Sequence, residues 1–187
     1  KHTLKSYRLI NCITTKKLAT QCGNFGVKRF IFLSSIGVLG NSTNRHGPFK
    51  HSDKPSPKED YAISKFEAEQ ELFKISKMSG LEVVVLRPPL VYGALAPGNL
   101  MRLINLVRYR LPLPFSHVKN KRSFIGIDNL VDILIHCIEH PDAKGKSFLV
   151  SDDDDVSTPD LIKKISQYLG IPSLLFPIPI FFLKFIS

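Results

Sequence analysis

A tyrosine and a lysine four residues apart are the pair in this sequence that could transfer a proton. Tyr61 and Lys65 lie in the stretch DYAISKFEAEQEL, which has a helical pattern, so the two side chains project from one helix face. A phenol has a pKa of about 10, and a neighbouring ammonium group favours its ionised form. We therefore expect Lys65 to lower the pKa of Tyr61, which could then act as an acid or base. The alternative is a surface pair with no chemical role.

A serine precedes this pair at the end of a predicted strand. VKRFIFLSS, residues 27–35, is short and rich in β-branched and aromatic residues, which is typical of a buried strand of a parallel sheet. Ligands bind at the carboxyl ends of such strands, so Ser35 could face Tyr61 across a crevice. No side chain carries a hydride, so redox chemistry at this trio would need a nicotinamide. The sequence contains no G-x-G-x-x-G turn for such a cofactor.

The rest of the pattern predicts alternating helices and strands. Helices are expected at residues 4–22, 57–78, 99–109, 128–140 and 159–169, and strands at 27–35, 81–89, 122–127 and 147–151. Ser56 and Glu59 have capping-box spacing with Pro57 at the first helical position, and Thr158 is the expected cap of the last helix. A strand, a crossover helix and a strand form a βαβ unit, so the fold class is α/β with a parallel sheet.

Apolar patterning also predicts which residues are buried. Phe124 and Ile127 are expected in the core as strand residues. On the helix at 128–140, one face is expected to be buried and carries Val131, Leu134, Cys137 and Ile138. The opposite face is expected to be exposed to solvent rather than to bind a metal ion, and it carries Asp132, His136 and His140. The run 152–155 is expected to be a solvated loop rather than a calcium site.

The apolar C-terminal stretch LLFPIPIFFLKFIS is too short to span a bilayer, so no integral membrane segment is expected. We expect it to be a helix or strand that packs against a segment beyond residue 187, and the alternative is contact with a membrane surface. The first residue is Lys1 rather than Met, and nothing resembles a signal peptide, so we expect the chain to be a fragment.

Composition limits the possible partners. The 187 residues carry 26 Lys plus Arg against 16 Asp plus Glu, a formal net charge of +10, which favours anionic partners such as phosphorylated metabolites. Basic residues are spread along the chain and the densest cluster, at 119–122, is short, so no nucleic acid is expected. Cys12, Cys22 and Cys137 form no C-x-x-C pair, which favours a reduced, cytoplasmic setting.

Ordered motifs along the chain resemble a known family. RFIFLSSIGVLG contains Ser35, YAISK begins 26 residues later, and LRPPLVYG and RSFIGIDNLVD follow. Together they are similar to the extended short-chain dehydrogenase/reductases, in particular the nucleotide-sugar 4-epimerases and 4-ketoreductases of bacterial surface-polysaccharide pathways. The resemblance covers nearly the whole chain. It implies a partial Rossmann-like parallel sheet with a small C-terminal substrate lobe, from which the family's first βαβ unit, with its glycine-rich turn, is missing.

The resemblance divides the chain into two lobes and assigns residue roles. Residues 1–91 and 122–151 would be the remainder of the NAD(P)-binding domain, and residues 92–121 and 152–187 the substrate-binding lobe. Ser35 would be the catalytic hydroxyl, Tyr61 the acid/base, and Lys65 the residue that tunes Tyr61 and holds the nicotinamide ribose. Asn11, Pro88 and Pro89 would also lie at the cofactor. Asn99, Leu100, Pro112 in the strand along the uracil, and Arg122 at the diphosphate would bind the substrate.

The resemblance implies an NAD-dependent UDP-sugar 4-epimerase, with NADP possible as the cofactor, that forms a homodimer through the helix of Tyr61 and the helix before the serine strand. Ile36 and Gly37 stand where the family's 4,6-dehydratases carry Asp-Glu, which disfavours dehydration. The alternatives are a UDP-4-keto-sugar reductase, a reductase of another alcohol such as a steroid or small aldehyde, a non-catalytic dinucleotide-binding protein, and an inactive truncated remnant.

Overall fold

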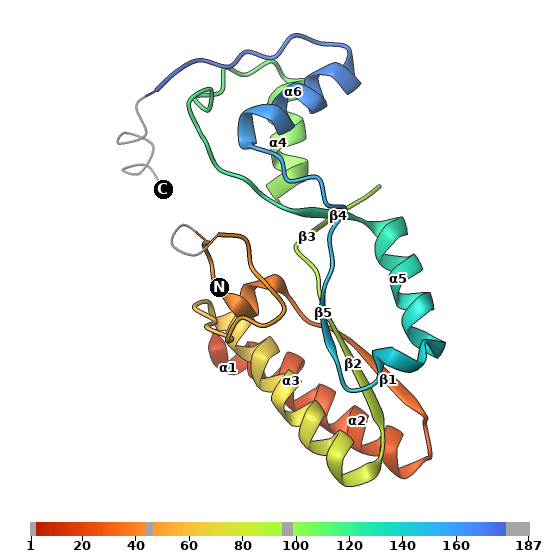
Figure 1. Cartoon of the computed structure of the whole chain (residues 1–187). Coiled ribbons are helices and arrows are strands. Elements are labelled where there is room, and N and C mark those ends of the chain that lie inside the picture. Colours follow the sequence, from red (N-terminus) through yellow and green to blue (C-terminus); the bar gives the residue numbers. More distant parts are fainter. Residues whose placement is uncertain (1–2, 44–46, 95–98, 179–187) are drawn as a thin grey trace. The chain divides into compact units, whose positions relative to one another are not determined.

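The computed structural model describes residues 3–43, 47–94 and 99–178, and it divides the chain into two compact units (Figure 1). The first unit comprises residues 1–89 and 127–151, and the second comprises residues 90–126 and 152–187. Both units combine helices with parallel strands, so the predicted α/β class is confirmed.

The first unit is built on a parallel sheet of three strands. Its strands are β1 (Arg29–Leu33), β2 (Glu82–Arg87) and β5 (Ser147–Leu149), in the order β1-β2-β5. The central strand β2 pairs Val85 with Phe32 of β1, and Leu86 with Phe148 of β5. The strands predicted at 27–35, 81–89 and 147–151 are therefore present and shorter at their ends than expected.

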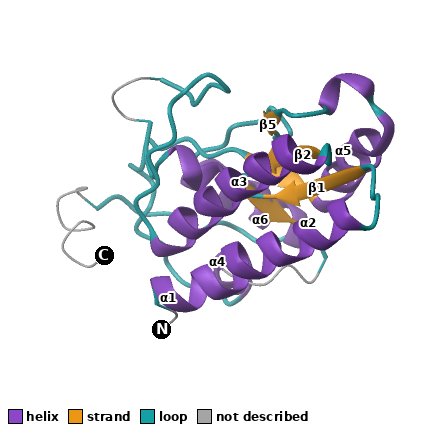
Figure 2. Cartoon of the chain, turned by 90° about the horizontal axis from the view of Figure 1, so that it is seen from below, coloured by secondary structure: helices purple, strands orange, loops and turns teal. Residues whose placement is uncertain are grey.

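Helices cover both faces of this sheet, as Figure 2 shows around β1 and β2. The helices are α2 (Thr15–Asn24), α3 (Asp60–Ser79) and α5 (Ile127–Glu139). Val83 and Val85 pack with residues of α2 and α3, whereas Val84 and Leu86 pack with residues of α5. Successive side chains of a strand point to opposite faces, so the continuous apolar run of β2 serves two cores.

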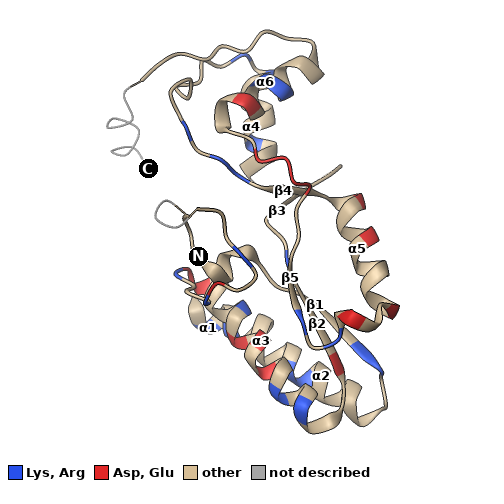
Figure 3. Ribbon diagram, in the orientation of Figure 1, with Lys and Arg blue, Asp and Glu red and all other residues tan. Residues whose placement is uncertain are grey.

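The helix predicted at 4–22 contains a wider turn. It consists of α1 (Leu4–Tyr7), a π-helical stretch η1 (Arg8–Thr14) and α2, which ends at Asn24. Ion pairs join it to α3, between Arg8 and Glu67 and between Lys16 and Glu71. Figure 3 shows the acidic residues along α3 and the basic residues along α2. Mid-helix π turns often occur at functional sites, and Asn11 lies in this one.

The predicted start of the Tyr61 helix is wrong by three residues. The helix α3 begins at Asp60, and Glu59 at its N-cap makes no capping bond with its side chain. The amide of Ser56 instead donates to the Val38 carbonyl at 2.9 Å, and the Glu59 carboxylate accepts from the Asn41 side chain at 3.0 Å. Contacts with the preceding loop therefore replace the expected capping box. The predicted stop is confirmed, since Gly80 caps the helix with a left-handed φ of 76°.

The expected burial of the helix α5 is only partly correct. Its predicted range, 128–140, shifts by one residue to Ile127–Glu139, and Cys137 is buried as expected. Val131 and Ile138 were expected to be buried but are 42% and 55% exposed. Ile127, expected in a core strand, begins this helix and is 43% exposed. Apolar residues occur on more than one side of α5, so the sequence pattern alone did not identify the side that packs on the sheet.

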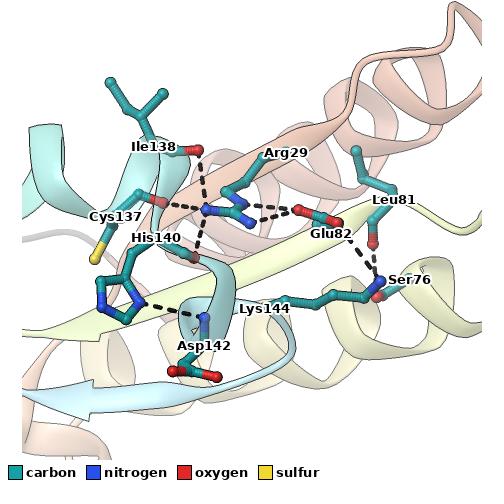
Figure 4. Close-up of polar contacts among 9 residues, drawn as sticks. All are labelled: Arg29, Ser76, Leu81, Glu82, Cys137, Ile138, His140, Asp142 and Lys144. Carbon is teal, nitrogen blue, oxygen red and sulfur yellow. Dashed lines mark hydrogen bonds and ion pairs between the residues drawn. The ribbon is translucent and has the colours of Figure 1, made fainter.

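A buried guanidinium joins the end of α5 to the sheet (Figure 4). Arg29 of β1 donates through Nη1 to the carbonyl oxygens of Cys137, Ile138 and His140, at 2.8, 2.9 and 2.9 Å. Its Nε and Nη2 donate to the Glu82 carboxylate at 2.9 and 2.6 Å. The last carbonyls of a helix have no partner within the helix, and here one side chain satisfies several of them.

The second unit contains a two-stranded parallel sheet and two packed helices. The elements are β3 (Leu90–Tyr92), α4 (Asn99–Arg108), β4 (Phe124–Gly126) and α6 (Thr158–Leu169). The core between the helices contains Val107, Leu113 and Ile162. The helix predicted at 99–109 and the strand at 122–127 are present, and Phe124 is buried as expected.

Three features of the second unit differ from expectation. Strand β3, which follows directly after Pro88 and Pro89 and pairs with β4, was not predicted, although β2 ends before the proline pair. The cap of α6 is Ser157, whose hydroxyl accepts from the Asp160 amide at 3.2 Å, rather than Thr158. Residues 174–176 find a partner within the chain, since Leu113 donates to the Leu174 carbonyl and accepts from the Phe176 amide. Residues 179–187 of the same stretch lie outside the described part.

In the described part of the chain, no helix is both long and apolar enough to cross a membrane. Residues 3–43, 47–94 and 99–178 likewise bring no three His, Cys, Asp or Glu side chains together in a way that could hold a metal ion. The Asp152 carboxylate, placed by the sequence in a solvated loop, accepts from the Gly126 amide at 3.0 Å and from the Tyr92 hydroxyl at 2.8 Å. This aspartate therefore contacts both strands of the small sheet.

Candidate active site

The helix α3 carries Tyr61 and Lys65 on one face at the carboxyl end of β1. Lys65 Nζ donates to the carbonyl of Leu33, the last residue of β1, at 2.8 Å. The same nitrogen lies 4.7 Å from the Phe32 ring centroid and 5.8 Å from the Tyr61 ring centroid. Tyr61 is 39% exposed. A cationic donor and an accessible phenol thus meet at the edge of the sheet where parallel folds bind ligands.

Burial shifts the pKa values of Tyr61 and Lys65 so that the neutral form of each side chain is favoured. It raises the pKa of Tyr61 above its ordinary value, and Tyr7 adds to this shift. Burial lowers the pKa of Lys65, and the Glu69 carboxylate opposes that change. The expected lowering of the Tyr61 pKa by Lys65 is not seen in this arrangement, where burial is the largest cause of the shift and the Lys65 ammonium is bonded to the Leu33 carbonyl.

Ser35 lies in a turn that packs on the first turn of α3. Its hydroxyl accepts from the Gly37 amide at 3.1 Å and caps the short helix η2 (Ile36–Leu39). A Cβ placed on Gly37 would lie 3.4 Å from the Cβ of Ala62, the residue after Tyr61. The Ser35 turn therefore lies directly against the first turn of the Tyr61 helix.

The proline pair lies beside the same turn. The Ile36 amide donates to the Pro88 carbonyl at 2.9 Å, and the Ser34 amide donates to the Leu86 carbonyl at 2.7 Å. Pro88 is buried and Pro89 is half-buried. The segment that leaves β2 is therefore bonded to the segment that leaves β1, which brings Pro88 next to the Ser35 turn.

Asn11 contacts the helix α3 through a buried hydroxyl. Its side-chain amide donates to Ser64 Oγ at 3.0 Å, and Ser64 Oγ donates to the Tyr61 carbonyl at 2.7 Å. Ser64 is completely buried. Asn11, predicted as a cofactor contact, thus contacts the backbone of α3 through one side chain in this structure.

The four predicted substrate-binding residues all belong to the second unit. Asn99 is the first residue of α4 and is exposed, and Leu100 follows it half-buried. Pro112 is exposed and precedes Leu113, which forms a bridge with Leu175 where a strand was expected along residues 111–115. Arg122 is exposed and pairs through its backbone with Val156.

Sequence reasoning missed three residues that contact the predicted catalytic group or its helix. The Tyr7 ring meets the Tyr61 ring edge-on, with the centroids 5.7 Å apart. Glu69 of α3 and Arg87 of β2 form a buried ion pair. A signal was present for the pair, because Glu69 lies one helical step of four residues beyond Lys65 and Arg87 directly precedes Pro88.

Comparison with known proteins identifies the family. Residues 3–151 match the model of the NAD dependent epimerase/dehydratase family. The chain belongs to this family. The match extends from α1 to the end of β5 and includes Asn11, Ser35, Tyr61 and Lys65. The family resemblance predicted from the motifs is thus confirmed.

Individual relatives of this epimerase/dehydratase family member act on nucleotide-linked or lipid-linked sugars, according to their names. A UDP-glucose 4-epimerase from Vibrio cholerae is 44% identical over 182 residues, 97% of this chain and 56% of that protein. An N-acetyl-α-D-glucosaminyl-diphospho-ditrans,octacis-undecaprenol 4-epimerase from Escherichia coli O157:H7 is 25% identical over 178 residues, 93% of this chain and 53% of that protein. The chain spans about half the length of these relatives.

The fold is also that of a solved protein structure. The structure of UDP-glucuronic acid 4-epimerase from Bacillus cereus in complex with NAD superposes with a TM-score of 0.82 at 22% identity. The match covers 93% of this chain and 58% of that one. At this identity the likeness shows the fold, and the predicted Rossmann-like architecture is confirmed.

Proposed function

We propose that the protein is a UDP-sugar 4-epimerase that uses NAD. The observation that carries this proposal is the meeting of Tyr61 and Lys65 with the Ser35 turn at the carboxyl end of β1, in a chain that is 44% identical to a UDP-glucose 4-epimerase. We assign cofactor binding to residues 1–91 and 122–151, and substrate binding to residues 92–121 and 152–187.

The residues at the end of β1 fit a nicotinamide riboside. A half-buried ammonium on Lys65 and the accessible phenol of Tyr61 are donors that suit ribose hydroxyls, and the half-buried Pro89, next to the buried Pro88, offers an apolar surface. When bound, NAD would supply the acceptor and later the donor of the hydride at sugar C4. Asn11, bonded through Ser64 to the Tyr61 carbonyl, would hold the start of α3 in place beside it.

Tyr61 would move the proton at the sugar 4-oxygen, and the Ser35 hydroxyl would hydrogen-bond the same oxygen. In the arrangement described, burial raises the pKa of Tyr61, which favours the acid form of the phenol, the form that returns a proton to O4. Removing a proton from O4 requires the phenolate, which the Lys65 ammonium would favour once it leaves the Leu33 carbonyl and turns toward the phenol.

The test is turnover in the purified protein supplied with NAD and a panel of UDP-sugars that includes UDP-glucose and UDP-glucuronic acid. Tyr61→Phe is expected to lower kcat by about 100-fold or more, because general acid–base catalysis contributes about 10²–10⁴-fold. Tyr168→Phe is the matched control, since Tyr168 is 93% exposed on α6. Retained turnover in Tyr61→Phe would refute the assigned role.

Cofactor stoichiometry separates the epimerase from a UDP-4-keto-sugar reductase. An epimerase turns over many substrates without net formation of NADH, whereas a reductase consumes one reduced cofactor per product. A protein that binds NAD but turns over no sugar of the panel would instead be a non-catalytic dinucleotide-binding protein.

The nucleotide diphosphate would contact the exposed residues of the second unit, with Arg122 on the phosphates and Asn99, Leu100 and Pro112 along the nucleotide. Arg122→Ala is expected to weaken UDP binding about 10- to 100-fold, because a charged hydrogen bond contributes about 1.5–3 kcal/mol. Lys163→Ala is the control, since Lys163 is a surface cation of the same unit. Unchanged affinity in Arg122→Ala would favour a substrate that is not a nucleotide-linked sugar.

The same proposal includes a cytoplasmic homodimer. Support for the dimer comes from exposed apolar residues on η1 and α2. They are Leu9, Ile10, Ile13 and Leu18, which are 58%, 60%, 44% and 55% exposed. Light scattering is expected to give twice the chain mass, and Ile10→Asp to give the single mass. A monomer at micromolar concentration would contradict this part of the proposal.

A further inference from the structure

A buried ion pair lies between the catalytic helix and the central strand. Arg87 donates through Nε and Nη2 to the two carboxylate oxygens of Glu69, at 3.0 and 2.6 Å. The Glu69 side chain is 2% exposed and the Arg87 side chain 8%. This parallel two-bond geometry fixes orientation as well as distance.

The two partners belong to the segments that carry the predicted catalytic and cofactor residues. Glu69 lies four residues after Lys65 and eight after Tyr61, so the three share one side of α3. Arg87 is the last residue of β2 and directly precedes Pro88. The backbone bonds from Ser34 and Ile36 to residues 86 and 88 join the Ser35 turn to the same end of β2.

A buried ion pair is a weak source of stability, because the cost of removing both charges from water offsets most of their attraction. Apolar side chains of similar volume at both positions often fold as well or better. Apolar side chains at these positions would not fix the orientation of the helix and strand or the distance between them, since apolar contacts are not directional. The Glu69–Arg87 pair is therefore suited to setting the position of α3 along β2.

We propose that Glu69 and Arg87 are positioning residues that hold Tyr61 and Lys65 in register with the Ser35 turn and Pro88. The inference rests on the proposed function for its kinetic consequence. Glu69 has a second effect, since its carboxylate favours the charged form of Lys65 against burial. Loss of this carboxylate is expected to lower the pKa of Lys65, so the fall of activity at high pH moves to lower pH.

The kinetic test compares Glu69→Gln and the double variant Glu69→Met/Arg87→Met with Glu71→Gln. Glu71 is the matched control because it lies on the same helix and pairs with Lys16 and Lys74 at the surface. The double variant is expected to unfold at the same urea concentration as the parent or higher, with kcat reduced about 10- to 100-fold because small misplacements of reacting groups have effects of this order. The KM for the UDP-sugar is expected to change less than about twofold.

A folded double variant with the parent kcat and pH profile would overturn the positioning role. If the double variant does not fold, Glu69→Gln decides by the same two measurements. An inactive parent protein would refute the proposed function. The effect of Glu69 on the pKa of Lys65 would then be tested alone, by NMR titration of ¹³C-methylated lysines. The Lys65 signal is assigned as the one that is lost in Lys65→Arg. The Lys65 titration is then expected at lower pH in Glu69→Gln and unchanged in Glu71→Gln, and an unmoved Lys65 in Glu69→Gln would contradict the inference.

Discussion

Arg29→Met would remove the guanidinium that joins the end of α5 to the sheet. The substitution keeps much of the apolar stem but removes the donors to the Cys137, Ile138 and His140 carbonyls (Figure 4). A net hydrogen bond to a charged group contributes about 1.5–3 kcal/mol, and removal of one partner from a buried charged network costs about 3–5 kcal/mol. One nitrogen serves all three carbonyls, so their contributions do not add. We expect a loss of about 3 kcal/mol in the free energy of unfolding.

The assay is urea unfolding followed by circular dichroism, together with hydrogen exchange of the amides in the last turn of α5. Exchange there is expected to accelerate in Arg29→Met, because the carbonyls at the helix end lose their partners. Lys144→Met is the control, since Lys144 is 64% exposed and meets Glu82 at 3.5 Å. A loss below about 1 kcal/mol in Arg29→Met would refute the reasoning, because this is the range of an exposed ion pair.

Three further substitutions test the packing, a helix end and the small sheet. Leu72→Ala empties a completely buried site of the α2–α3 core and is expected to cost about 2–5 kcal/mol in urea unfolding, and a cost below about 1 kcal/mol would contradict that core. Gly80→Ala places a Cβ at a φ of 76° and is expected to cost about 1–2 kcal/mol, whereas unchanged stability would contradict the left-handed cap. The pKa of Tyr92 is raised because its hydroxyl donates to Asp152. In Asp152→Asn, Tyr92 is therefore expected to ionise at lower pH, as measured by an absorbance titration with Tyr92→Phe as the reference. An unchanged titration would contradict the contact.

The order of helices and strands in the first unit could be predicted because local signals agreed with the tertiary fold. β1 and β2 are short apolar runs, and a left-handed glycine ends α3 where the sequence places a stop. The start of α3 could not be predicted, because Ser56 and Glu59 are bonded to Val38 and Asn41, residues that the chain brings close only by folding.

The candidate site was predictable where spacing alone determines proximity. Tyr61 and Lys65 share a helix face at any position of that helix, and Ser35 follows directly from the end of a strand. The direction of the Tyr61 pKa shift could not be predicted, because it depends on how far folding buries the phenol and brings Tyr7 beside it. Arg87 was marked in the sequence only by its place before Pro88, because its partner Glu69 is known only once β2 lies against α3.

The first unit is interrupted in the sequence, which matters while the protein is being synthesised. Residues 1–89 contribute β1 and β2, but α5, which covers the Val84 and Leu86 side of the sheet, and β5, which pairs with β2, come only from residues 127–151. Translation proceeds at roughly 5–20 residues per second, so this apolar face waits several seconds for its cover. During that interval the nascent chain presents a surface that chaperones bind, and slower translation of residues 90–126 would lengthen the exposure.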